Sequence, residues 1–310
     1  MRDRKHTLFA IAVAAAVLGA ASRLDRGAAP AQADLVNQAR RLDLEGKQDA
    51  AIALYRQALD RAPDSFDAHY GIARALDLIG SYEEARRHFA RAIDLASEGV
   101  KDQALRMMGV SYAFTGNAAE AATYFRQVFD RDIAAGNFVA AAEVANELGR
   151  VFLELGHLND GDKWYRIGYE TTTRQRNRLA SEVDLAKLRW AHAQGRVAAR
   201  RGNAREAWRQ AAIVKQSLDK GTNPDQNIQY PYLVGYIHFY LKAFKDAIAA
   251  LQNADQGDPF ILVLLAQANE ELGNTAIARE YYRKALASNS HAVSNAFARP
   301  LARQRIASPR

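Results

Sequence analysis

The sequence contains no cysteine, and this absence removes several classes of protein. A disulfide framework and a thiolate zinc site both require cysteine, so neither can form. A lipid-anchored bacterial lipoprotein is excluded as well, because the residue that carries its lipid is a cysteine. The 310 residues are 49% hydrophobic and 25% charged, so the chain has enough apolar material for a core and no excess of charge that would indicate disorder.

Familiar catalytic and metal-binding motifs are also missing from the sequence. There is no phosphate-binding glycine loop, no H-E-x-x-H and no G-x-S-x-G. The histidines never recur at the three- or four-residue spacing of a helical metal site. The segment Asn159-Asp-Gly-Asp162 resembles part of a calcium loop, but it lacks the remaining ligands and can serve as a turn and helix cap. We therefore predict no enzymatic activity, no cofactor and no metal.

The net charge of the chain is +7, and about half of it comes from the amino-terminal segment. The remainder is small for this length and favours nucleic-acid binding only weakly. A basic region around Arg174, Arg176, Arg178 and Lys187 leaves a nucleic-acid-binding helical repeat as a remote alternative. No base-reading repeat code is visible, so our prediction is that the chain binds no nucleic acid.

The amino terminus has the order of a secretory leader. Basic MRDRKH precedes an apolar run from Leu8 to Ala21, and small residues lead to Ala31-Gln32-Ala33, an A-x-A cleavage pattern. We predict a signal peptide over residues 1–33 and export to the periplasm or the medium. The apolar run is shorter than the roughly 20 residues that span a bilayer comfortably, although an uncleaved, tilted inner-membrane anchor is the alternative.

Residues 67–97 contain two short amphipathic segments separated by Gly80-Ser81. Ile72 and Leu76 fall on one face of the first segment, and Ala85 and Phe89 fall on one face of the second. One helix pair cannot bury either apolar stripe alone. Stacked copies can, so this pair predicts the building block of a helical solenoid.

The same pair recurs along the chain with one glycine at its central turn. The turn positions are Gly46, Gly80, Gly116, Gly156, Gly202 and Gly273, with Lys242 in that place once. Small residues follow where the two helices of a pair should approach most closely: Ala51, Ala85, Ala121, Gly161, Ala207, Ala247 and Ala278. Four residues further on come plugs for the space between units, mostly aromatic: Tyr55, Phe89, Phe125, Tyr165, Ala211, Leu251 and Tyr282. About seven units are predicted.

This pattern resembles the tetratricopeptide repeat family, whose W-x2-L-G-x2-Y, A-x3-F and P positions appear here in degenerate form. The third unit shows it best, with Leu105, Gly109 and Tyr112 before Ala121 and Phe125. The resemblance covers residues 34–290. It implies an all-α fold, a right-handed superhelical solenoid of antiparallel helix pairs. The interval between turn glycines grows toward the middle of the chain, which predicts longer helices there.

Two regions depart from the repeat. Residues 220–227 lack helical periodicity and predict a loop or flexion point inside the superhelix. Residues 291–310 contain no acidic residue and four arginines, and Phe297 and Leu301 give them enough apolar character for a short helix. We predict a basic capping tail in which Pro300 interrupts the helix.

In the family that the pattern resembles, the first helix of each pair lines a concave groove that holds an extended peptide or a partner helix. Carried onto this sequence, that face predicts a peptide-binding set of Tyr70, Arg74, Arg106, Asn146, Arg150, His192, Arg196, Tyr232, Tyr236 and Tyr240. Arginine forks suit carboxylates, which indicates an acidic or C-terminal peptide segment with an aromatic or apolar anchor. The alternative is that these arginines only pair with Asp and Glu and that the tyrosines pack against their neighbours.

A leader followed by repeats and no catalytic motif favours an exported scaffold for protein–protein interaction. An accessory or docking subunit of an envelope enzyme, secretion or assembly complex is the alternative. The two differ only in the identity of the protein partner, which no residue pattern in the chain reveals.

Overall fold

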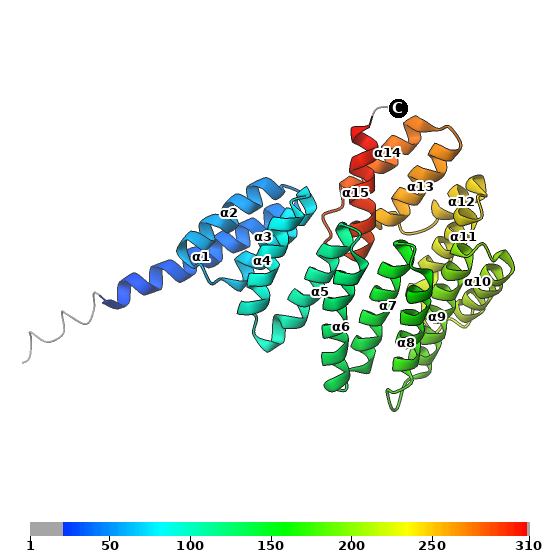
Figure 1. The fold of residues 1–310 in the computed structure, drawn as a ribbon, viewed down its shortest axis with the longest axis horizontal. Helices are drawn as coiled ribbons and strands as arrows, with labels where there is room; N and C mark the ends of the chain where they lie inside the picture. The colour runs from blue at the N-terminus through cyan, green and yellow to red at the C-terminus, as the bar shows by residue number, and fades with distance from the viewer. Residues whose placement is uncertain (1–20, 309–310) are drawn as a thin grey trace, which may run out of the picture.

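The computed structural model describes residues 21–308, which form fifteen α-helices, one 3-10 helix and no strand (Figure 1). The first fourteen α-helices make seven successive pairs, each packed against the next. The pairs are α1 (Ala21–Leu44) with α2 (Gln48–Arg61), α3 (Phe66–Ile79) with α4 (Tyr82–Leu95), α5 (Glu98–Phe114) with α6 (Ala118–Ala134), α7 (Phe138–Glu154) with α8 (Leu158–Thr172), α9 (Ala180–Arg200) with α10 (Ala204–Leu218), α11 (Gln229–Tyr240) with α12 (Phe244–Leu251), and α13 (Pro259–Glu271) with α14 (Thr275–Leu286). The prediction of an all-α solenoid of seven units is confirmed.

Most of the predicted leader lies outside the described residues. Its last part belongs to α1, which continues as one helix through Ala33, the residue at the predicted cleavage site. Between residues 21 and 308, no helix combines the length and the apolar character that crossing a membrane requires.

The turn glycines have the conformation that their position in the repeat requires. The six turn glycines predicted from the repeat pattern all have a positive φ, between 70° and 93°. This is the left-handed region that only glycine adopts without steric cost. Lys242 occupies the equivalent turn of the sixth unit with a φ of 64°. A lysine therefore adopts the conformation that glycine supplies in the other six units.

The small residues of the repeat lie at the helix crossings, as predicted. Ala51, Ala85, Ala121, Ala207, Ala247 and Ala278 have no exposed surface. On the facing helix, glycines receive the plug residues. A Cβ atom at Gly235 would lie 2.4 Å from Cγ of Leu251, and one at Gly109 would lie 2.8 Å from the Phe125 ring. The fifth unit has only Ala211 at the plug position, and Leu233 of the next unit reaches Gly195 there instead.

Helix lengths follow the spacing of the glycines. Helices α5, α6 and α7 have 17 residues each and α9 has 21, against 14 in α3 and α4. The expected loop at residues 220–227 contains a short 3-10 helix, η1 (Pro224–Ile228). A second loop, which was not predicted from the sequence, lies at residues 173–179 between α8 and α9. In the sequence these residues stand out by their basic charge and contain no proline or glycine that would indicate a break in the helices.

The predicted interruption at Pro300 is wrong. Helix α15 (Val293–Ala307) runs through Pro300 as one element of 15 residues. It packs against α13 and α14 and also against α5 and α7, so it does not only cover the last unit (Figure 1). Three of these neighbours, α5, α7 and α13, are first helices of their pairs, the set predicted to line the groove. The chain's own C-terminal helix therefore occupies part of that face.

Candidate binding cavity on the concave face

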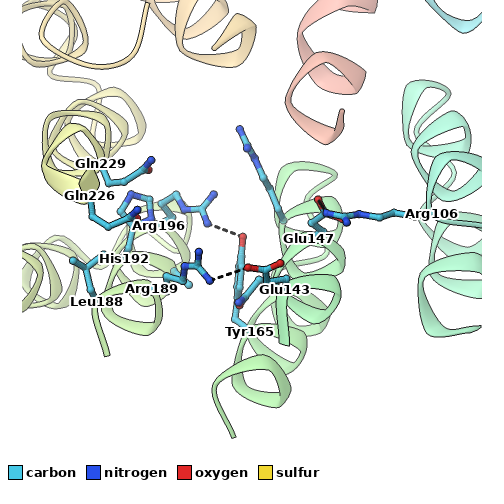
Figure 2. Close-up of a pocket in the computed structure, with 13 residues that line it drawn as sticks. Arg106, Glu143, Glu147, Tyr165, Leu188, Arg189, His192, Arg196, Gln226 and Gln229 are labelled. Atoms are coloured by element: carbon cyan, nitrogen blue, oxygen red, sulfur yellow. Dashed lines mark hydrogen bonds and ion pairs between the residues drawn. The ribbon is translucent and has the colours of Figure 1, made fainter. Parts of the chain in front are cut away.

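A cavity of about 430 Å³ opens among helices α5, α7, α8 and α9 beside the segment that leads into α11 (Figure 2). Half of the predicted peptide-binding set lines it. These residues are Arg106, Asn146, Arg150, His192 and Arg196. Their side chains come from first helices of three successive units, α5, α7 and α9, which is the arrangement that the phase of the repeat predicts.

Two arginines of the cavity are paired with carboxylates. Arg106 donates from Nε and Nη2 to the two carboxylate oxygens of Glu147, both at 2.6 Å. Arg189 donates from Nη1 to Glu143 at 3.5 Å, and Figure 2 shows these two side chains directed toward each other. Both pairs are partly open to solvent. Their charges are largely neutralised within the protein.

Arg196 lies deeper and is less well satisfied. Its side chain is 8% exposed, and Nη2 donates to the Tyr165 hydroxyl at 2.8 Å (Figure 2). The nearest carboxylate oxygen, on Glu154, is 3.7 Å from Nη1, beyond hydrogen-bond distance. Nε of Arg196 has no hydrogen-bond partner among residues 21–308.

Arg150 shows the same deficit on the opposite wall. Its Nη2 lies 3.8 Å from Oδ2 of Asp258, and its guanidinium rests over the Phe260 ring at 5.2 Å. Within the described part of the chain, neither Nε nor Nη2 of Arg150 has a hydrogen-bond partner. A buried hydrogen-bond donor that stays unpaired lowers the stability of a protein by about 1–3 kcal/mol. The cavity therefore holds donors suited to an anionic group.

His192 adds a further polar group to the lining of the cavity, and Tyr232 of α11 lies beside it. Nε2 of His192 and the hydroxyl of Tyr232 are also buried without a partner in residues 21–308, and the two rings are 5.5 Å apart. Burial, and then the cation of Arg196, hold the pKa of His192 well below its ordinary value. His192 is therefore neutral, and its Nε2 can donate a hydrogen bond to a ligand or accept one from it, depending on the tautomer, without adding charge.

A smaller apolar recess adjoins this cavity. Its volume is about 80 Å³, and it shares Asn146, Tyr165 and Arg189 with the cavity. Apolar side chains make up much of its lining, among them Val139, Ala142, Leu185, Ala186 and Trp190. A ligand that placed a charged group between Arg150 and Arg196 could extend an apolar side chain into the recess.

Three residues of the predicted peptide-binding set, Tyr232, Tyr236 and Tyr240, lie on α11. Tyr232 is 5% exposed and Tyr236 has no exposed surface. Tyr236 donates to Glu154 at 3.1 Å, and Tyr240 accepts a hydrogen bond from Arg200 at 3.1 Å. These rings are held by their neighbours because α11 is enclosed by α9 and α13 on its first-helix side. Tyr232 and Tyr236 therefore follow the alternative given above, in which the tyrosines pack against their neighbours.

Tyr70 and Arg74 lie on α3, outside the lining of the cavity. The Tyr70 hydroxyl accepts a hydrogen bond from Gln103 at 3.0 Å, and the Arg74 guanidinium lies 5.9 Å from the Tyr70 ring centroid. The structure thus separates the ten predicted residues into the five of the cavity, three tyrosines on α11 and this pair in the second unit.

Several residues of the site were not predicted from the sequence. Tyr165 was assigned only as a plug between units, yet its hydroxyl reaches the cavity and contacts Arg196. Glu154 and Asp258, the distant carboxylates, stand at a helix end and a helix start, where they look like ordinary surface acids. Gln226 and Gln229 come from the segment around η1, which has no repeat phase from which to place them.

The sequence also matches family models at three places. Residues 44–99, 103–132 and 261–291 each match a model described as tetratricopeptide repeat. The chain is built of tetratricopeptide repeats. These matches cover parts of units one to three and the last unit, and the third unit contributes Arg106 to the cavity. No curated protein matches the sequence significantly.

Solved structures share the fold of this repeat protein. A tetratricopeptide repeat protein from Parabacteroides merdae is 11% identical, with a TM-score of 0.52, and the alignment covers 90% of this chain and 98% of the other. The apo form of RapI is 14% identical, with a TM-score of 0.53 and coverages of 89% and 98%. These structural alignments establish a common fold over nearly the whole chain. Because the identities are this low, they do not indicate which ligand the chain binds.

Between residues 21 and 308, no group of three or more histidine, aspartate or glutamate side chains is arranged to hold a metal ion.

Proposed function

We propose that this tetratricopeptide repeat protein is a non-enzymatic scaffold that binds a segment of a partner protein in the cavity between α7 and α9. The observation that carries the proposal is the set of buried donors without partners on Arg150 and Arg196, in a cavity that opens on the concave face. A carboxylate from a ligand would give these donors the acceptors that Glu154 and Asp258 are too distant to supply.

The ligand that fits best is an acidic peptide segment or a C-terminal carboxylate with a neighbouring apolar side chain. Two guanidinium groups face the cavity from opposite walls, and the recess beside them is lined largely by apolar groups. Asn146 lies between the two and can bond a peptide backbone through both its donor and its acceptor. The anchor is therefore assigned to the recess in place of Tyr236.

The test is an array of hexapeptides in matched pairs. One member of each pair carries a free C-terminal carboxylate or an aspartate, and the other carries the amide or asparagine. Wild-type protein should prefer the charged member, and Arg150→Met should remove most of that preference. Arg87→Gln, on the exposed side of α4, is the control and should bind as wild type does. Equal binding of charged and neutral peptides, or no effect of Arg150→Met, would contradict the proposal.

We also propose that the scaffold works outside the cytoplasm, on the basis of the basic, apolar and small-residue order of residues 1–33. Intact-mass measurement after expression in a secreting host should find a chain that begins at Asp34. A full-length chain in the soluble cytoplasmic fraction would rule out export, while a full-length membrane-bound chain would rule out only cleavage. Affinity capture from the envelope fraction would then identify the partner.

A further inference from the structure

The C-terminal segment, residues 288–307, connects two parts of the molecule that otherwise meet mainly at the junction of α7 and α8 with α9. Leu78 at the end of α3 and buried apolar residues of α5 to α8 form one cluster, and those of α9 to α14 form another. Helix α15 contributes to both: Val293 and Ala296 belong to the first cluster, Ala298 and Ala302 belong to the second, and Phe297 packs against each.

Polar contacts attach this segment to the amino-terminal units. Nε2 of His291 lies 2.7 Å from Oδ2 of Asp77, and neither side chain has any exposed surface. Arg299 donates from Nε to the Leu78 carbonyl at 2.6 Å, and Arg303 donates to the same carbonyl. Buried charged and polar groups of this kind are satisfied in one relative placement of the two elements, so they fix position more narrowly than apolar contacts do.

Contacts at the first unit extend the attachment. Asn289 donates to the Leu44 carbonyl at 3.2 Å and accepts from Gln48 at 3.1 Å. Residues 288–307 thus touch the beginning, the middle and the end of the solenoid. The ends of an open superhelix would be free to move relative to one another.

The cavity lies where the two clusters face each other. Arg150 projects from α7, in the first cluster's half, and Arg196 projects from α9, in the second. Between α15 and the cavity, the Phe297 ring lies 6.4 Å from the Phe260 ring, over which the Arg150 guanidinium rests. The two arginine-bearing walls also meet directly, since Arg200 of α9 pairs with Glu154 of α7 at 3.1 Å. Helix α15 adds a second connection between them through Phe297 and Phe260.

We propose that residues 288–307 are a positioning strut, which holds the superhelix closed and keeps Arg150 and Arg196 at the spacing that binds one anionic group. The part about affinity rests on the proposed function, whereas the part about closure does not. A preorganised cavity binds more tightly because the cost of ordering its walls has already been met in the free protein.

Closure can be measured without any ligand. The protein has no cysteine, so Ala90→Cys on α4 and Ala276→Cys on α14 introduce the only two sites for nitroxide labels, both of them exposed. Pulsed electron–electron double resonance should give one narrow distance distribution in the labelled parent. Arg299→Met with Arg303→Met removes the bonds to Leu78, together with those of Arg299 to the Leu286 and Ser288 carbonyls. We expect a broader distribution that extends to longer distances.

Arg305→Met is the matched control on the same helix. Its guanidinium faces Glu270 of α13, inside the carboxy-terminal half, so the distribution should stay narrow. Should the double variant lose its helical circular dichroism signal, the single variant Arg303→Met replaces it, because this side chain is only partly buried. A distribution in the folded variant that matches the parent would overturn the strut.

The binding part uses the tightest charged hexapeptide from the array as its probe. Arg299 and Arg303 do not line the cavity. Their replacement should nevertheless lower the affinity for this peptide about tenfold, a typical coupling between separated elements. The control Arg305→Met should bind as the parent does. Broadening without any change in affinity would overturn the positioning role and leave the peptide site intact. If no peptide binds the parent, the proposed function fails while the distance measurement still decides closure.

Discussion

At the scale of single residues, Lys242 is the one departure from the glycine pattern of the turns. A side chain in the left-handed region costs about 1 kcal/mol relative to glycine, and Lys242 holds a φ of 64° there. Lys242→Gly should therefore raise the midpoint of thermal unfolding. Lys245→Gly, three residues on inside α12, should lower it, because glycine is a poor helix former. Equal shifts of both variants would contradict this assignment.

Two histidines, His69 of α3 and His88 of α4, contact each other. Nδ1 of His69 lies 2.9 Å from Nδ1 of His88, and this contact needs one nitrogen to accept. Burial, and then His69, lower the pKa of His88 to about 4 from an ordinary value of 6.5. The unfolded chain therefore binds a proton between those values that the folded chain does not bind.

Stability should consequently fall as the pH drops from about 6.5 to about 4. His88→Gln removes this titration, so the melting temperature of the variant should depend less on pH over the same interval. The measurement is thermal unfolding at several pH values, followed by circular dichroism. A variant whose pH dependence equals that of the wild type would show that His88 is not the group responsible.

At the scale of elements, the two irregular connections differ in how they are held. The connection after α10 is tied to α9, since Lys220 pairs with Asp184 at 2.6 Å and Asn223 bonds the Ser181 carbonyl at 3.0 Å. In the connection after α8, residues 176–178 make no backbone hydrogen bond to any other described residue. This loop is exposed over most of its length and contains three arginines.

Limited trypsin digestion should therefore cut after Arg174 or Arg176 before it cuts after Lys220. This order differs from the expectation that the sequence alone supports, because the glycine, proline and asparagine of residues 220–227 indicate the weaker segment. Mass spectrometry of the earliest fragments gives the answer. First cleavage at Lys220 would mean that the bonds to α9 do not protect the backbone there.

In the whole molecule, α15 connects units of the solenoid that are not adjacent in sequence. Repeat arrays whose units contact only adjacent units can unfold in parts. Here a helix at one end contacts α5 and α7 far from it in sequence, so the two halves should unfold together. A chain that ends at Ala287 should show two thermal transitions by calorimetry where the full chain shows one. A chain that ends at Ser308, with α15 complete, is the control and should keep a single transition.

A truncated chain with one transition at the original temperature would contradict the cooperative role of the segment. The same experiment has a bearing on the cavity, since its two walls belong to the two halves that α15 joins.

The repeat can be predicted from the sequence, because contacts between residues close together in the chain specify each helix pair. Turn glycines, small residues at crossings and plugs recur at fixed intervals, and the phase also identified Lys242 as a turn residue and placed Arg150 on a helix that lines the cavity. Five cavity residues followed from that phase. The period says which face of a helix points inward, and it cannot say whether an inward tyrosine remains accessible.

The groups that fill the concave face depend on contacts between helices far apart in the chain. The bonds of Arg299 to Leu78 and of His291 to Asp77 join residues more than 200 positions apart, and no local pattern encodes such a pairing. The burial of Tyr236 and the distances that leave Arg150 and Arg196 without close carboxylates likewise depend on how non-adjacent helices meet. The sequence of a repeat specifies how it packs against the adjacent repeats. The shape of the whole superhelix results from small rotations between units, added over seven units. The contacts of α15 then hold one closed arrangement.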